Sequence, residues 1–243
     1  MKQVKVKENQ DQLEAVVDEI KLRLNWNSLD RMADYLRLSD DKSLKPEQKL
    51  ALAISGWLLG GGAGIENLGT ALPLFQVRNL VREYLKTDTV DLQRRREILE
   101  QLAQLEGSGP EFLAKLIANM VPPLDPPQPP ADNIIGGLFQ LSVPLGDGPP
   151  LKYLIQLPPE YDPLRRYPTV LSLHDANTTP AMQIDWWAGI YNQDRKRRLG
   201  QATRHGYIVI APDWSEPKQR HYQFSFRAHA AVLKSLRDAT KRF

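Results

Sequence analysis

Two short clusters of polar and aromatic residues carry the side chains best suited to chemistry, and each follows an apolar run. Residues 173–177 read Leu-His-Asp-Ala-Asn, and residues 211–216 read Ala-Pro-Asp-Trp-Ser-Glu. A histidine beside carboxylates can act as a general base or bind a metal ion, and a nearby serine can act as a nucleophile. His174 is therefore open to three interpretations: a catalytic base, a metal ligand, or the residue at which a strand opens into a functional loop.

The segments that precede these clusters place both of them at one edge of a sheet. Residues 168–175 and 207–213 are short, continuous apolar runs, which are typical of strands buried on both faces of a parallel sheet. Between them we expect a helical, basic stretch that ends at His205 and Gly206, since glycine suits the position after a helix. Sites in open α/β sheets form outside the carboxyl ends of the strands, so the two clusters are predicted to meet.

Three longer segments resemble one family in their order and spacing. They are YLIQLPPEYDP at 153–163, YPTVLSLHDAN at 167–177 and GYIVIAPDW at 206–214. Together they are similar to the α/β-hydrolase family, in particular its esterase- and peptidase-like branch of serine hydrolases. The resemblance implies an α/β fold in which an antiparallel hairpin precedes parallel strands with crossover helices. It also implies acyl transfer to, or hydrolysis of, an ester or amide, and we expect no cofactor and no metal.

The resemblance assigns roles to residues of both clusters. In the family, a backbone N–H of the loop after the first parallel strand helps to hold the oxyanion of the tetrahedral intermediate. Carried over, this donor is the N–H of Asp175 or Ala176, although Asp175 stands where glycine is usual. The substrate, a small ester or peptide-like molecule, is expected to contact His174, Asn177, Trp186, Trp187, Asp213 and Trp214.

The nucleophile of the family is missing from these residues. Its elbow motif, G-x-S-x-G, occurs nowhere in the 243 residues. In the family the serine, the acid and the histidine follow in that order after the helix that would end near Phe243. We therefore expect all three to lie beyond Phe243, so that this chain is a fragment of a hydrolase and is inactive alone.

Two improvised sites are alternatives within the chain. Ser215 lies close in sequence to Asp213 and His221, but it has no elbow and no second oxyanion donor. A metal ion could be held by His174 and Asp175 together with Asp213 and His221. Neither cluster shows an H-x-x-x-H type of spacing, which disfavours the metal site.

The chain changes character near residue 121. Helical spacing dominates residues 1–120, where we expect helices at roughly 43–59, 74–86, 90–106 and 110–119. Residues 121–132, VPPLDPPQPPAD, contain six prolines and are typical of a semi-rigid linker. Residues 133–243 then alternate strands and helices. We predict an all-α domain, a linker and the N-terminal half of an α/β-hydrolase domain.

A nucleic-acid-binding module is the main alternative function. Residues 98–117 are two helical segments joined by Gly-Ser-Gly-Pro, which is similar to a helix-hairpin-helix turn, and residues 195–198, RKRR, form the most basic run. Glu106 and Glu111 flank the turn and disfavour phosphate, so a capped turn and a solvated helix face are the simpler interpretations. A non-catalytic interaction protein is the third alternative.

Bulk composition excludes several classes of protein. The chain has no cysteine, which excludes disulfides and thiol catalysis, and its net charge is only +3. The first ten residues are charged and lack the apolar core of a signal peptide. The longest uncharged run, at 50–65, has sixteen residues and five glycines, short of the roughly 20 needed to span a bilayer. We expect a buried helix that runs into a glycine loop, no membrane span and, by default, a cytoplasmic location.

Overall fold

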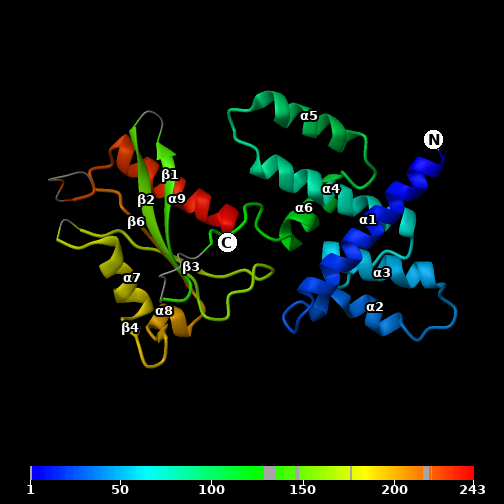
Figure 1. Cartoon of the computed structure of the whole chain (residues 1–243), viewed down its shortest axis with the longest axis horizontal. Helices are drawn as coiled ribbons and strands as arrows, with labels where there is room; N and C mark the ends of the chain where they lie inside the picture. Colours follow the sequence, from blue (N-terminus) through cyan, green and yellow to red (C-terminus); the bar gives the residue numbers. More distant parts are fainter. Residues whose placement is uncertain (1, 129–134, 146–147, 176, 216–218, 220) are drawn as a thin grey trace. The chain divides into compact units, whose positions relative to one another are not determined.

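A computed structural model describes residues 2–128, 135–145, 148–175, 177–215, 219 and 221–243. The chain forms two compact units, Met1–Pro123 and Leu124–Phe243 (Figure 1). A helical region precedes a mixed four-stranded sheet with helices, so the α/β class with an N-terminal all-α part is confirmed at this level. Among the described residues, no helix is long and apolar enough to cross a membrane.

The first unit packs around one helix. Residues 51–59 of α3 are all buried, as expected of a helix that is apolar on every side. It contacts α1, α2, α4 and α6, and it ends at Gly60, so the predicted buried helix with a glycine loop is confirmed. The helices of this unit are α1 (Lys2–Arg23), η1 (Leu29–Met32), α2 (Ala33–Leu38), α3 (Pro46–Leu59), α4 (Leu68–Lys86), α5 (Leu92–Ala103) and α6 (Pro110–Asn119).

Side-chain caps set where two of these helices begin. Asn67 accepts a hydrogen bond from the Gly69 N–H at 2.8 Å, so α4 starts six residues earlier than the expected 74–86. Asp91 accepts from the Arg94 N–H at 3.0 Å, which makes it the cap of α5. Gly107, with φ of +87°, lies in the turn before α6, where a Cβ would approach Leu74 Cδ2 to 2.6 Å. Packing against Leu74 thus requires a glycine at position 107, and Pro110 takes the first position of α6.

A nearly buried ion pair ties α1 to the rest of this unit. Arg78 of α4 donates to both carboxylate oxygens of Glu19 at 2.6 Å, and Trp57 Nε1 of α3 donates to the same carboxylate at 3.1 Å. Burial by itself would raise the pKa of Glu19, but the hydrogen bonds and charge of Arg78 outweigh it, so the pKa is lowered. Three helices therefore share one carboxylate.

Replacing Glu19 by Gln is expected to lower the free energy of unfolding by about 2 kcal/mol at neutral pH, because Arg78 stays buried without its counter-charge. Because the pKa of Glu19 is lowered in the folded state, its ionised carboxylate contributes its full stabilisation above the ordinary pKa of 4.5. This stabilisation is lost as the pH falls through the folded-state pKa. The deficit of the variant should therefore shrink below pH 4.5 in urea unfolding followed by circular dichroism. The control Asp18→Asn, in an exposed pair with Lys21, should change stability by under about 0.5 kcal/mol. Equal effects of the two substitutions would contradict this account.

The second unit is built on a sheet with strand order β1-β2-β6-β3 (Figure 1). β1 pairs with β2 and β2 with β6 in antiparallel fashion, whereas β3 and β6 are parallel. The elements are β1 (Leu138–Leu145), β2 (Gly148–Gln156), β3 (Thr169–Leu171), α7 (Pro180–Ala188), β4 (Tyr191–Asn192), β5 (Arg197–Arg198), α8 (Gln201–Arg204), β6 (Ile208–Pro212) and α9 (Phe226–Arg242). The predicted hairpin and the predicted parallel pair of strands are both present.

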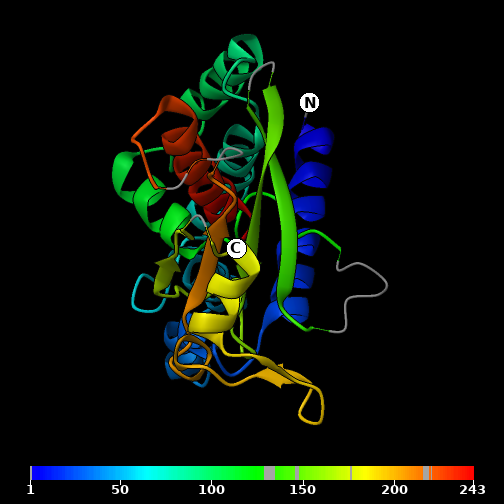
Figure 2. The same ribbon diagram turned by 90° about the vertical axis from the view of Figure 1, so that its left-hand side faces the viewer.

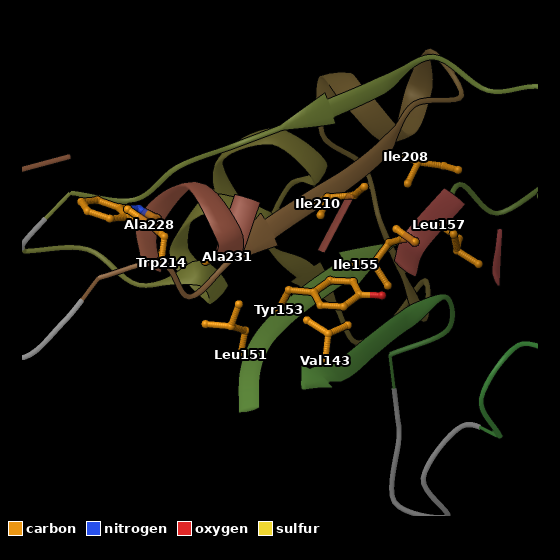
Figure 3. Close-up of a cluster of buried hydrophobic side chains, with 11 residues drawn as sticks. Val143, Leu151, Tyr153, Ile155, Leu157, Ile208, Ile210, Trp214, Ala228 and Ala231 are labelled. Carbon is orange, nitrogen blue, oxygen red and sulfur yellow. The ribbon is translucent and has the colours of Figure 1, made fainter. Parts of the chain in front are cut away.

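Helices cover both faces of β6, whose five residues are all buried. Ile208 and Ile210 pack in a core with alanines of α9, and Figure 3 shows these side chains grouped with those of β1 and β2. Val209 and Ala211 face the other way and pack with residues of α7 and α8. Tyr153 of β2 extends the α9 side, where its hydroxyl donates to Asp238 at 2.7 Å; burial and this carboxylate raise the pKa of Tyr153.

The segment between β3 and β6 differs from the expected basic helix. It contains α7, then a second two-stranded sheet of β4 and β5, then the single turn of α8. Gly189, with φ of +88°, ends α7. The prediction of a solvated helix face for residues 195–198 was therefore wrong, since these residues lie in the β4–β5 hairpin.

Strand β3 forms one edge of the sheet. It is shorter than the predicted run 168–175, and its residues are exposed or half-buried rather than buried on both faces. Ile208 N–H donates to Pro168 O and Ser172 N–H to Ile210 O. By the alternation of a parallel ladder, Thr169 and Leu171 direct their backbone groups away from β6, where no described strand pairs with them.

Amide exchange within β3 tests this open edge. Thr169 and Leu171 should exchange quickly, whereas Val170 and Ser172, which face β6, should exchange on the order of a hundredfold more slowly. Hydrogen–deuterium exchange read by NMR separates the four amides, and each neighbour serves as the control for the next. Equal protection of all four would show that the far edge of β3 is also paired.

Candidate functional site

The two predicted clusters meet where β3 and β6 end. The chain leaves β3 through Ser172 and reaches His174, and it leaves β6 at Pro212 and continues into Asp213 and Trp214. The indole N–H of Trp214 donates to the His174 carbonyl at 3.0 Å, and the two rings lie 5.4 Å apart. Trp214 also packs in the core beside α9 (Figure 3). The indole therefore joins the two loops and anchors them to the core.

His174 is buried, with 6% of its surface exposed. Its Nδ1 lies 2.8 Å from the Asp175 carbonyl oxygen, which can only accept, so Nδ1 carries a proton. Nε2 lies 3.7 Å from Asp213 Oδ1 and has no hydrogen-bond partner among the described residues. In a neutral ring, Nε2 is then an acceptor directed at the exposed carboxylate of Asp213, and a proton placed on Nε2 would complete an ion pair.

Asp175 closes the loop through both its backbone and its side chain. Its N–H donates to Thr178 Oγ1 at 3.0 Å, and its Oδ1 accepts from the Asn177 N–H at 2.8 Å. This side-chain turn gives a structural reason for an aspartate where glycine was expected. Because the Asp175 N–H already donates to Thr178 Oγ1, it could donate to an oxyanion only after that hydrogen bond breaks. Ala176, the other predicted donor, lies outside the described residues.

Two of the three tryptophans predicted to contact substrate, Trp186 and Trp187, lie apart from this pair of loops. Trp187 donates from Nε1 to Ser172 Oγ at 3.0 Å and lines a groove of about 580 Å³ with Pro168 and Tyr207, which precede the parallel strands. Trp186 is 80% exposed. The structure thus brings together His174, Asp175, Asn177, Asp213 and Trp214, but not Trp186 or Trp187.

Aromatic residues after β6 extend the site in a way that sequence reasoning missed in part. Tyr222 packs against Trp214 with ring centroids 5.1 Å apart, and it contacts His229 at 5.7 Å and Phe224 at 5.3 Å. His229 is an exposed residue of α9, and nothing in the sequence indicates its ring contacts. Phe224 is 74% exposed and has a φ of +56°, which is uncommon for an aromatic residue. No local sequence signal marks that conformation.

No family model matches this chain, and no curated protein or solved structure is significantly similar to it. Its function must therefore be argued from the geometry of the site and from the residues that carry the family resemblance.

The improvised sites find no support in the geometry. Among the residues that the structure describes, no three histidine or carboxylate side chains come close enough to hold a metal ion. In the same residues no hydrogen bond joins Ser215 to a histidine. Ser172, the buried serine at the end of β3, donates to Gln183 Oε1 at 2.7 Å and is held inside the fold.

The basic run is divided by its structure. Arg198 is buried and pairs with Asp185 of α7, and it also donates to the Gly189 carbonyl. Arg195, Lys196 and Arg197 are exposed. At most three of the four cations can therefore meet a partner, and they belong to a different unit from the turn at 98–117.

The geometry predicts the tautomer of His174. In the neutral ring the proton should lie on Nδ1, because the Asp175 carbonyl requires a donor there. Imidazole ¹⁵N chemical shifts measure this directly, with the resonance assigned by its loss in His174→Asn. The exposed His205 is the control and should show a mixture of both tautomers. A proton found on Nε2 of His174 would contradict the proposed hydrogen bond to Asp175.

Proposed function

We propose that the second unit is the N-terminal part of the sheet of a serine hydrolase of the α/β-hydrolase type, which cleaves an ester or an amide by acyl transfer. The strand order carries this proposal. The antiparallel pair β1 and β2 comes first in the chain, and the parallel strands β3 and β6 follow. Although β3 precedes β6 in the chain, it lies at the edge of the sheet, and β6 lies between it and β2. The α/β-hydrolase resemblance implies such an antiparallel hairpin before parallel strands.

The open edge of β3 supports the proposal that the nucleophile lies on a further strand of the same sheet. A further parallel strand beside Thr169 and Leu171 would end at the same edge of the sheet as His174 and Asp213. A nucleophilic serine on the turn after that strand would then face the loop at 173–179. Its hydroxyl would attack the substrate carbonyl while a histidine accepts the proton. In this scheme the second-unit loops bind and position, and they supply no nucleophile.

The loop would serve the oxyanion through backbone N–H groups. The Asp175 N–H is held by Thr178 Oγ1 here, so donation to an oxyanion requires a small rearrangement of the turn. The buried histidine ring and Trp214 would form the wall behind these donors. Asp213, Asn177 and the aromatic side chains after β6 would then contact the substrate.

The 243-residue chain is expected to be inactive. It should neither hydrolyse p-nitrophenyl esters above the rate of its Ser215→Ala variant nor form an adduct with a serine-reactive fluorophosphonate, since the 243 residues contain no G-x-S-x-G motif. A Ser215-dependent rate or adduct would overturn the proposal, because a complete site would then lie within these residues.

The gene supplies the positive test. The reading frame should encode a G-x-S-x-G within roughly 25 codons after that of Phe243, given the usual length of a loop and a strand. The protein made from the whole frame should react with the fluorophosphonate at that serine. A frame without the motif would contradict the proposal and favour a non-catalytic interaction protein.

A further inference from the structure

Helix α7 carries apolar side chains on two opposite sides. Ile184 and Ala188 are fully buried and pack with Val209 and Ala211 of β6. Met182 and Trp186, one helical turn apart, lie on the solvent side and are 50% and 80% exposed. A surface helix of a globular protein normally places polar residues there. The solvent side of α7 therefore departs from the usual amphipathic pattern.

The polar residues of α7 do not relieve this exposure, because both of them are engaged inside the unit. Gln183 accepts a hydrogen bond from Ser172, and Asp185 is paired with the buried Arg198. Ile190, which follows the helix after Gly189, is also 79% exposed. Met182, Trp186 and Ile190 are called the α7 ridge below.

The cationic β4–β5 hairpin follows α7 in the chain and extends from the end of that helix (Figure 2). The Gly200 N–H donates to Ala188 O at 2.7 Å, and Arg198 donates to Gly189 O. Gly189 and Gly200 lie so close that a Cβ on Gly200 would be 2.2 Å from the Gly189 nitrogen. The position of the hairpin relative to α7 is thus determined by backbone contacts.

The tip of the β4–β5 hairpin carries an excess of positive charge. Arg195, Lys196 and Arg197 are exposed there, against a single carboxylate at the tip, that of Asp194. Lys196 adopts a φ of +50°, so the turn holds an uncommon conformation for a lysine. Three exposed cations therefore follow the α7 ridge along the chain, on the hairpin whose base is fixed to the end of α7.

We propose that the α7 ridge and the hairpin cations together bind the surface of an anionic phospholipid bilayer. Indole rings favour the headgroup level of a bilayer, and an aliphatic side chain such as that of Ile190 gains from entering the acyl boundary. The negative surface potential of such a membrane attracts each nearby cation. A nucleic acid would use the cations, but it would leave Met182 and Ile190 in water.

This inference is independent of the proposed hydrolase chemistry. The ridge and hairpin lie on elements other than the loops at 173–177 and 213–215, and binding needs no serine nucleophile. It concerns adsorption to a surface and agrees with the finding that no described helix crosses a membrane.

Sedimentation with vesicles tests the inference on the 243-residue protein. Vesicles of phosphatidylcholine with phosphatidylserine should bind the protein, and binding should weaken as salt is raised. Each cation contributes roughly fivefold to such binding, so Arg195→Glu with Arg197→Glu should lower the partition coefficient at least about 25-fold. Trp186→Ala with Ile190→Ser should lower it on the same vesicles. The matched control is Leu233→Ala with Arg237→Glu on α9, both exposed, which should bind like the parent.

A second measurement does not depend on how the multiple variants fold. Brominated lipids in the same vesicles should quench tryptophan fluorescence in the parent protein, and the quenching should largely disappear in Trp186→Phe. Absence of vesicle binding, equal binding to pure phosphatidylcholine, or quenching that persists in Trp186→Phe would overturn the proposal. Binding to DNA or RNA oligonucleotides without binding to vesicles would also overturn it and assign the cations to nucleic acid.

Discussion

Burial of strand β6 on both faces is the constraint on which the second unit depends. Its alternate side chains pack against α9 on one side and against α7 and α8 on the other, and both of its edges are paired. A polar side chain at any of its five positions would lose water without gaining a partner. The strand ends in Asp213 and Trp214, so the same burial also fixes where the polar loops begin.

Much of this unit could be predicted because its signals are local. A change from helical to strand periodicity and continuous apolar runs are readable in single segments. The pairing of β3 with β6 follows from the preference for short parallel crossovers. The segment at 190–200 was not predictable, because its hairpin depends on the Arg198–Asp185 pair and on the approach of Gly200 to Gly189. Both are tertiary contacts, and composition alone favoured a helix.

In the candidate site, too, the positions of the loops could be predicted, whereas the hydrogen bonds of individual side chains could not. The meeting of His174 with Asp213 was expected from the topology, since both follow parallel neighbours. The roles of individual hydrogen bonds were not, because they depend on side-chain rotamers. The carboxylate of Asp175 accepts a hydrogen bond within a turn. The indole N–H of Trp187 donates to Ser172 instead of lining the loops. What these residues do in catalysis stays a prediction.

The close approach of the Gly189 and Gly200 backbones has an evolutionary consequence. Any side chain at Gly200 would overlap the backbone of residues 188 and 189, and Gly189 also needs its left-handed conformation. Selection that preserves this close approach must keep both glycines and the buried Arg198, whereas the exposed residues at the hairpin tip are free to change in composition and in number. In distant homologues, the pair of glycines should persist after the exposed cations of the tip have diverged.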